Sequence, residues 1–506
     1  LSGKTVTIDE SGGATTYAST SELNTIQTNS GQTVTYTKLT DTAALLVTNK
    51  ADIIAGVTAT VVETGGASTF ATAANIVALN AQISGKAGAA ITYTKLNDTA
   101  ENLAGADASI LSGKTVTIDE SGGATTYAST SELNTIQTNS GQTVTYTKLT
   151  DTAALLVTNK ADIVAGVTAT AVETGGASTL ATIAQINSLQ TQATSAGSGA
   201  SFVYTKVNDE SANIVGNTSE GAIQDITGKT VTVTTASNVT NYAAMITAAG
   251  GGGSVAGAVV DTAANLASGV TLTGATSVTA EISNANDLVS VTLDSEVTHI
   301  DISTNSVANV LLDINDLTNR TITNTGSGSY KVKDTAANLA GADASLLNGQ
   351  TIIINDTATA ATTSELNTIQ TSMGTGSVTY TKLSGTAAQL VTNKADIIAG
   401  VAATAVETGG TSTFATAADI VALNAQISGK VGASITYTKL NDTAENLANA
   451  ASSILSGKTV TIDESGGATT YASTSELNTI QTNSGQTVTY TKLTDTAALL
   501  VTNKAD

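Results

Sequence analysis

The sequence predicts an α/β fold, a right-handed parallel β-α solenoid of strand-helix units about 27 residues long, with a β-rich irregular insert. Three observations lead to this prediction. Short runs that alternate polar and apolar residues are followed by helical apolar stripes. An Asp, usually the start of the triplet Asp-Thr-Ala, recurs along the chain. Strands and helices therefore alternate, and parallel strands joined by helices make right-handed crossovers.

The first unit is expected to begin with a strand and to continue into a capped helix. Residues 4–9 alternate polar with apolar side chains, as a half-buried strand does. Ser19 and Glu22 have the spacing of a capping box, and Leu23 and Ile26 give the following helix an apolar face. The same box recurs, so the sequence predicts helix caps at Ser19, Ser129 and Ser473.

The second unit repeats this order of elements. Residues 33–39 predict a strand, and a helix is expected to start at Asp41. The apolar stripe of that helix is predicted to be Ala43, Leu46, Val47, Ala51 and Ile54. Further strands are expected at 58–63 and 90–96, each followed by a helix. Four strand-helix units thus occupy residues 1–110.

The repeat fails in one region, between about residue 270 and residue 330. When Gly385 is counted as a member of the series, the interval from Asp261 to Asp334 is longer than any other interval between successive members. Short β-type runs recur there with little helical pattern between them, which favours tighter coils or short hairpins. The predicted regions are solenoid repeats at 1–269, a β-rich insert at 270–330 and solenoid repeats at 331–506.

The recurring Asp is predicted to be a helix N-cap, because its carboxylate can accept the unpaired amides of the first turn and favours the helix dipole. Gly385 takes its place once. The predicted Asp caps are Asp41, Asp98, Asp151, Asp209, Asp261, Asp334, Asp442 and Asp495.

Composition limits the class of partner. The net charge is −21, with 41 acidic and 20 basic residues, which disfavours binding to nucleic acid or to anionic lipid. No apolar run approaches the ~18 residues that a membrane-spanning helix needs, so we expect no membrane insertion. Hydrophobic residues make up 41% of the chain, which is enough for a packed core and argues against disorder.

The sequence offers no catalytic and no cofactor-binding residues, and we expect that the protein is not an enzyme. The one histidine, His299, has no second His and no Cys with which to form a zinc site. No established calcium motif is present either. Asp9, Glu10 and Glu63 lie just before Gly-Gly turns, which makes them the candidates for a calcium ion, although solvated turns are the plainer interpretation.

The strands carry rows of threonine on the face opposite Val34 and Tyr36. The plainest interpretation is a soluble sheet face with good β propensity. A second is a surface for lateral contacts between chains or for attached glycans. A third is ice binding, which requires a flat and regular threonine array.

The Asp-Thr-Ala-Ala-Asn-Leu stretches at Asp261 and Asp334, with variants at Asp41 and Asp98, resemble repeats of very large bacterial cell-surface proteins, especially those of cyanobacteria and other aquatic bacteria. This resemblance implies secretion, a surface location and a structural, adhesive or motility-related role. It implies no catalytic residues.

Residues 1–52 recur unchanged at 111–162 and at 455–506, which favours a segment of a longer polypeptide. One end therefore has the sequence of the other, and repeats could continue the stack. We expect a structural protein that forms an extracellular filament, sheath or surface layer, with copies of itself as partner and surface glycans as a further candidate. The alternatives are a spacer or stalk of a large adhesin and, more remotely, an ice-binding threonine face.

Overall fold

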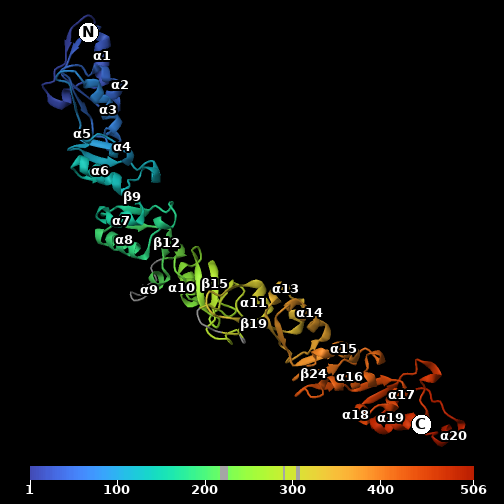
Figure 1. Cartoon of the computed structure of the whole chain (residues 1–506). Coiled ribbons are helices and arrows are strands. Elements are labelled where there is room, and N and C mark those ends of the chain that lie inside the picture. Colours follow the sequence, from blue (N-terminus) through green and yellow to red (C-terminus); the bar gives the residue numbers. More distant parts are fainter. Residues whose placement is uncertain (217–225, 289–290, 304–307, 506) are drawn as a thin grey trace. The chain divides into compact units, whose positions relative to one another are not determined.

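The computed structural model describes residues 1–216, 226–288, 291–303 and 308–505. In this part of the chain short strands and helices alternate along the sequence (Figure 1). The fold is mixed α/β, and its sheets are small and built from parallel strands. Residues 289–290 and 304–307 of the predicted insert lie outside the described residues.

The chain divides into two compact units near the predicted start of the insert. The first unit comprises Leu1–Val259 and Thr271–Thr276. The second comprises Val260–Val270 and Ser277–Asp506.

The strands of the first unit pair in parallel with partners that are close in sequence. β1 pairs with β2, and three-stranded sheets follow with the orders β3-β4-β5, β6-β7-β8 and β9-β10-β11. β13 then pairs with β12 on one side and β14 on the other. The strands are β1 (Val6–Thr7), β2 (Val34–Thr35), β3 (Lys38–Asp41), β4 (Thr58–Val61), β5 (Ala90–Thr92), β6 (Lys95–Asp98), β7 (Thr115–Ile118), β8 (Val144–Thr145), β9 (Lys148–Asp151), β10 (Thr168–Ala171), β11 (Ser201–Val203), β12 (Lys206–Asp209), β13 (Thr230–Val233) and β14 (Ser254–Thr262).

The number of residues between two paired positions alternates between a smaller and a larger value, which we call the short and the long step. The strand-helix units are therefore not of uniform length. Lys38 pairs with Thr58, and Lys95 pairs with Thr115, so both pairs span the same short step along the chain. The next step carries a longer helix and is longer, as from Val116 to Val144. Extra residues therefore lie in the helical arm of the long step. The short step is the same in the pairs Lys38–Thr58, Lys95–Thr115 and Lys148–Thr168, and it is four residues longer from Lys206 to Thr230.

The predicted strand at 33–39 is split in the structure. β2 and β3 belong to different sheets, and the chain turns a corner between them at Tyr36 and Thr37. Val34, Tyr36 and Leu39 are buried, so the alternation of side chains changes phase at this corner. The prediction of one straight strand was wrong because the chain passes from the edge of one small sheet to the start of the next.

The helices of the first unit pack on their neighbours in sequence. α2 packs on α3, and both α4 and α5 pack on α6. The helices are α1 (Thr20–Ser30), α2 (Ala43–Thr48), α3 (Ala73–Ile83), α4 (Ala100–Ala104), α5 (Ala108–Leu111), α6 (Thr130–Ser140), α7 (Ala153–Thr158), α8 (Ile183–Ala196), α9 (Ser211–Gly216) and α10 (Val239–Ala249).

The helix predicted from Asp41 is shorter than expected. α2 ends at Thr48, and a 3₁₀ turn at Lys50–Asp52 follows it. A 3₁₀ turn advances fewer residues per turn than an α-helix, so the apolar phase shifts by one position. Ile53 is consequently fully buried, and Ile54, which we predicted to be on the apolar stripe, is 46% exposed.

The second unit has the same construction. β15 pairs with β16 and β16 with β18, and further sheets have the orders β17-β19-β20-β22, β21-β23-β24-β25 and β26-β27-β28. Its strands are β15 (Ala275–Glu281), β16 (His299–Asp301), β17 (Val310–Leu312), β18 (Thr321–Thr323), β19 (Tyr330–Asp334), β20 (Thr351–Ile354), β21 (Ala361–Thr362), β22 (Ser377–Thr379), β23 (Lys382–Gly385), β24 (Ala402–Ala405), β25 (Ser434–Thr436), β26 (Lys439–Asp442), β27 (Thr459–Ile462) and β28 (Val488–Thr489).

The helices of the second unit again alternate with these strands. They are α11 (Ile314–Asn319), α12 (Ala336–Gly341), α13 (Ala344–Leu347), α14 (Thr363–Met373), α15 (Ala387–Thr392), α16 (Ala417–Ile427), α17 (Ala444–Asn449), α18 (Ser452–Leu455), α19 (Thr474–Ser484) and α20 (Ala497–Thr502).

In its described part, the predicted insert contains parallel strands and one helix. Ile300 pairs with Ile322, and Leu311 pairs with Lys331, both in parallel. Both pairs are parallel, so they are not hairpins, but the steps they span are about as long as the short step of the repeats, so the coils here are no tighter. α11 was not predicted, because it is only six residues long and gives a weak periodic pattern.

The core is a column of small and branched residues between each sheet and its helices. Leu39, Ala59, Leu96 and Val116 on the paired strands are all fully buried. The identical segments show that this burial depends on the following unit. Leu46 and Leu156 are 0% exposed, whereas their equivalent Leu500 is 37% exposed.

Candidate functional site

The recurring Asp connects its own strand-helix unit to the preceding strand-helix unit. In the first copy, Asp41 Oδ2 accepts hydrogen bonds from the amide (3.1 Å) and the hydroxyl (2.6 Å) of Thr20, the first residue of α1. Asp41 Oδ1 accepts the amide of Thr42 (2.8 Å). We call this arrangement the Asp clamp. In the described residues it links seven pairs, Asp41–Thr20, Asp98–Ala73, Asp151–Thr130, Asp209–Ile183, Asp334–Ile314, Asp442–Ala417 and Asp495–Thr474.

The prediction that these Asp residues cap the helices that follow them was wrong. The N-cap is the next residue, and its hydroxyl accepts an amide of the first turn, as Thr42 accepts Leu45. The residues in this role are Thr42, Thr99, Thr152, Thr335, Thr443 and Thr496, in place of Asp41, Asp98, Asp151, Asp334, Asp442 and Asp495. The Asp still neutralises a helix N-terminus, but that of the preceding unit.

Two further Asp residues depart from the prediction in their own ways. Asp209 Oδ1 accepts the Glu210 amide (2.8 Å) and the Asn213 side chain (2.8 Å), beside its clamp to Ile183. Asp261 lies within β14, and no helix follows it directly in the structure, so it caps none. The predicted capping boxes are present at Ser19, Ser129 and Ser473, each with its Glu three residues later.

A second carboxylate fixes the corner between neighbouring sheets. Glu10 Oε1 accepts the amides of Thr37 (2.8 Å) and Lys38 (2.7 Å), and Glu10 Oε2 accepts the Thr37 hydroxyl. We call this arrangement the Glu clamp. Its carboxylates in the described residues are Glu10, Glu63, Glu120, Glu173, Asp356, Glu407 and Glu464.

The calcium candidates therefore have protein partners. Glu10 and Glu63 each accept three donors from the next corner. Asp9 Oδ1 accepts the Ser11 amide (2.9 Å) in a local turn. In the part of the chain that the structure describes, no group of three or more His, Cys, Asp or Glu side chains is placed to hold a metal ion.

The Glu clamp favours the charged carboxylate. Burial alone would raise the pKa of Glu10, but the hydrogen bonds from Thr37 and Lys38 and the Lys38 charge outweigh it and lower the pKa. The pKa of Glu464 is lowered for the same reasons by Thr491 and Lys492. Since these folded-state pKa values lie below the ordinary one, the clamps stabilise the fold above pH 4.5 and lose their effect as the pH falls below it.

The corner tyrosine makes a third contact between segments. Tyr36 is 8% exposed, and its hydroxyl donates to the Asp52 carbonyl (2.7 Å) at the end of the helical arm. Tyr93 donates to Ile110 in the same way. Burial, and then the nearby Asp52 charge, raise the pKa of Tyr36 to about 12.

Alkaline conditions are therefore expected to unfold the protein. Since the ordinary pKa is 10.0, the unfolded chain loses tyrosine protons first, and stability falls as the pH rises from about 10 toward 12. Urea unfolding followed by circular dichroism at increasing pH measures the loss, and the part of the phenolate absorbance that comes from the buried corner tyrosines, such as Tyr36 and Tyr93, should appear only with unfolding. Tyr36→Phe should cost about 1 kcal/mol, because the Asp52 carbonyl loses its donor. Phenolate absorbance that is complete before the protein unfolds would contradict this expectation.

Several lysines lie over aromatic rings rather than in ion pairs. Lys95 Nζ lies 4.9 Å from the centre of the Phe70 ring, and Lys114 Nζ lies 4.5 Å from that of Tyr93. The one ion pair in the described residues joins Arg320 Nη1 to Asp316 Oδ1 (2.9 Å) in the predicted insert. Burial, followed by the Asp313 charge, raises the pKa of Asp316 to about 6.

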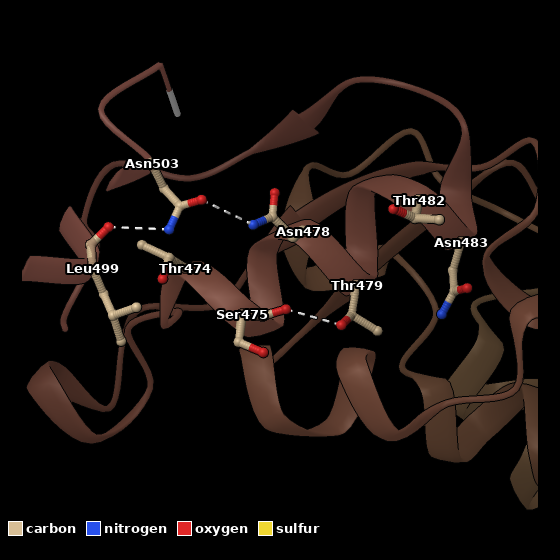
Figure 2. Close-up of a pocket in the computed structure, with 8 residues that line it drawn as sticks. All are labelled: Thr474, Ser475, Asn478, Thr479, Thr482, Asn483, Leu499 and Asn503. Carbon is tan, nitrogen blue, oxygen red and sulfur yellow. Dashed lines mark hydrogen bonds between the residues drawn. The ribbon is translucent and has the colours of Figure 1, made fainter. Parts of the chain in front are cut away.

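A shallow groove lies between α19 and α20 (Figure 2). It measures about 510 Å³, and Asn478 crosses it with a hydrogen bond from Nδ2 to Asn503 Oδ1 (3.4 Å). The equivalent groove between α1 and α2 has the matching Asn24–Asn49 bond (3.2 Å). Neither groove has a charged or aromatic lining residue, so we assign neither a ligand. The lining residues in Figure 2 are Thr474, Ser475, Asn478, Thr479, Thr482, Asn483, Leu499 and Asn503.

The threonine rows lie on the outer face of the sheets. Thr35 and Thr37 are exposed beside buried Val34 and Tyr36. Thr40, Thr60 and Thr92 stand side by side on three paired strands. The sheet that carries this row is only three strands wide.

His299 lies on β16, with its Nδ1 2.8 Å from the Thr298 hydroxyl. None of the helices in the described ranges is both long and apolar enough to cross a membrane.

No family model matches the chain, and no curated protein matches it.

Proposed function

We propose that this chain is a structural repeat protein, without enzymatic activity, that builds an extracellular filament, sheath or surface layer at a bacterial cell surface by stacking of its repeats. The observation that carries this proposal is the pair of carboxylate clamps. Each clamp uses one carboxylate for contacts between successive units, and the two occur seven times each in the described residues.

The pattern of strand pairing supports the stacking of repeats. Many strands pair in parallel with the next or the previous strand along the chain, and others, such as β20 and β22, with the next strand but one, as successive turns of a solenoid would. The same repeated segment buries Leu46 fully where another turn follows it, so each turn supplies the cover for the one before. Such a protein gains stability by elongation, which suits a structural role.

The acidic side chains with recognisable roles are used in clamps and turns. Glu10, Glu63 and Asp41 bind the chain's own amides and hydroxyls, so neither calcium nor another cofactor is part of the proposal. Copies of the same chain are the proposed partners. Contacts between copies would use the exposed outer face, where threonine predominates.

A deletion that keeps the register tests the proposal. Removing residues 54–163 joins Ile53 to Val164, which is the residue that follows the equivalent Ile163 in the intact chain. Purified wild type should form filaments or sheets in electron micrographs, and the axial repeat of the deletion variant should be shorter by the removed units. A variant with the same segment duplicated is the matched control and should lengthen it.

Two outcomes would overturn the proposal in different ways. Isolated globular particles whose dimensions do not follow the number of units would argue against stacking itself. Particles that lengthen with added units but remain single chains would favour the stalk of an adhesin over a polymer.

A further inference from the structure

The helix α11 carries a charged side chain where its counterparts carry a buried isoleucine. The Asp clamp joins the start of α11 to the next strand-helix unit as it joins α1, so the two helices correspond. Arg320 lies seven residues after the N-cap Asp313. The same position is Ile136 in α6, Ile369 in α14 and Ile480 in α19, all 0% exposed. Arg320 is the one arginine of the chain, and its side chain is only 5% exposed.

One carboxylate neutralises this arginine. Arg320 Nη1 donates to Asp316 Oδ1 (2.9 Å), and Asp316 is 8% exposed. Arg320 Nη2 makes only long contacts with the carbonyls of Leu293 (3.5 Å) and Asp294 (3.4 Å), and Nε has no acceptor in the described part of the chain. A buried ion pair adds little net stability, because desolvation offsets the attraction. Its presence in place of an isoleucine is better explained by a property that isoleucine lacks, a response to protons.

Carboxylates outnumber the arginine at this place. Asp313 Oδ1 accepts the Asp316 amide (2.7 Å), so both carboxylates lie at the start of the same helix. Asp334 Oδ2 accepts the Ile314 amide (3.1 Å) in the Asp clamp. These three carboxylates and Lys333 border a cavity of about 220 Å³, which is large enough for water to carry a proton to Asp316. Two carboxylates that share one arginine take up a proton more readily than an isolated Asp does.

That proton has a defined acceptor. A neutral Asp316 can donate its hydroxyl to the Asp313 carboxylate. The charge of Asp313, Asp316 and Arg320 together is −1 − 1 + 1 = −1, and one added proton brings it to zero. The other charged groups on the elements packed against α11 are Lys333 and Asp334 on β19, Asp343 at the start of α13, and Asp294 on the turn that Arg320 contacts.

We propose that α11 is a pH-sensitive element of the fold: one proton shared by Asp313 and Asp316 holds the helix in place in mild acid, and loss of this proton loosens it near neutral pH. Burial, followed by the Asp313 charge, keeps the folded-state pKa of Asp316 at about 6, above the ordinary 3.8. This contribution to stability is therefore present in acid and is lost as the pH rises through about 6. The Glu clamps have the opposite dependence, because their pKa values are lowered.

Amide hydrogen exchange on the 506-residue chain tests the proposal, with each rate expressed as a protection factor so that the intrinsic effect of pH is removed. The Leu317 and Arg320 amides donate to the carbonyls of Asp313 and Asp316 within α11. Their protection should be about tenfold greater at about pH 5 than at about pH 7.5. The amides of α14, which has Ile369 in place of the arginine, are the internal control and should be equally protected at both.

Three variants identify the groups responsible. Asp316→Asn imitates the neutral carboxyl, so it should keep α11 highly protected at about pH 7.5 and remove the pH response. Asp343→Asn is the matched control, because it removes the same charge from an exposed side chain and should leave the response intact. Asp313→Asn removes the other carboxylate of the pair and should reduce the response, which keeps the test decisive if Asp316→Asn does not fold.

Four results would each overturn the proposal. They are equal protection of wild-type α11 at the two pH values, an equal pH response in α14, a pH response that persists in Asp316→Asn, and an unchanged response in Asp313→Asn. The measurement follows single amides within one chain, so its outcome is independent of filament formation.

Discussion

Replacing Asp98 by alanine is expected to lower the free energy of unfolding by about 3 kcal/mol. Asp98 is 8% exposed, and its carboxylate accepts the Ala73 amide (3.0 Å), the Thr99 amide (2.9 Å) and the Asn102 side chain (2.8 Å). Truncation would leave the first amide of α3 without its acceptor in a site largely closed to water. It would also remove a hydrogen bond that joins two successive strand-helix units.

Urea unfolding of the variant and of wild type measures this loss. Asp107→Ala is the matched control, because Asp107 is exposed and caps its own short helix α5 through Ser109, without a described hydrogen bond to another strand-helix unit. Asp98→Asn keeps one acceptor oxygen and should fall between the two. If Asp98→Ala costs no more than Asp107→Ala, the Asp clamp is not a source of stability, and the role we give it is wrong.

Replacing Glu63 by alanine is expected to cost about 2–3 kcal/mol. Its carboxylate accepts the Thr94 amide (2.7 Å), the Thr94 hydroxyl and the Lys95 amide (2.8 Å), so three donors at the corner between β5 and β6 would lose a charged acceptor. The expected loss of unfolding free energy is smaller than that for Asp98, because Glu63 is only half-buried and water can replace part of its contact.

Glu101→Ala is the control for Glu63, since Glu101 is an exposed acidic residue with no side-chain hydrogen bond among the described contacts. Glu63→Gln should retain one acceptor and about half of the stability. Hydrogen exchange should locate the damage, with faster exchange at the amides of Thr94 and Lys95. If exchange instead became faster to the same extent at amides throughout the first compact unit, the Glu63 clamp would have no local role at this corner.

The sequence was informative wherever a contact is local. The capping box at Ser19 lies within four residues, and the pattern around it predicts both the helix start and its apolar face. The parallel α/β character also followed from short strands that alternate with helices. Helix and strand boundaries were less accurate. The phase change at Thr37 is visible in the positions of Val34, Tyr36 and Leu39, which no single straight strand can bury together.

The clamps were missed because they join residues far apart in sequence. Asp41 is an acceptable N-cap by composition, and only the structure shows that Thr42 takes that role while the carboxylate turns to Thr20. One indication was available. An acidic residue recurs one strand-helix unit before each Thr-Lys pair, as Glu10 does before Thr37 and Lys38. Correlated spacing of this kind identifies partners, whereas the type of each residue alone does not.

The exact repetition of whole segments has a consequence for the gene. Where matching DNA encodes the exact copies at 1–52 and 111–162, unequal recombination between them would excise or add whole sets of strand-helix units at a time. Each product would rejoin every strand and clamp to an equivalent partner, because the two copies stand at the same point of the alternation. The products would be chains of different lengths with the same strand pairs and carboxylate clamps. The length of the protein could therefore change without any new type of contact.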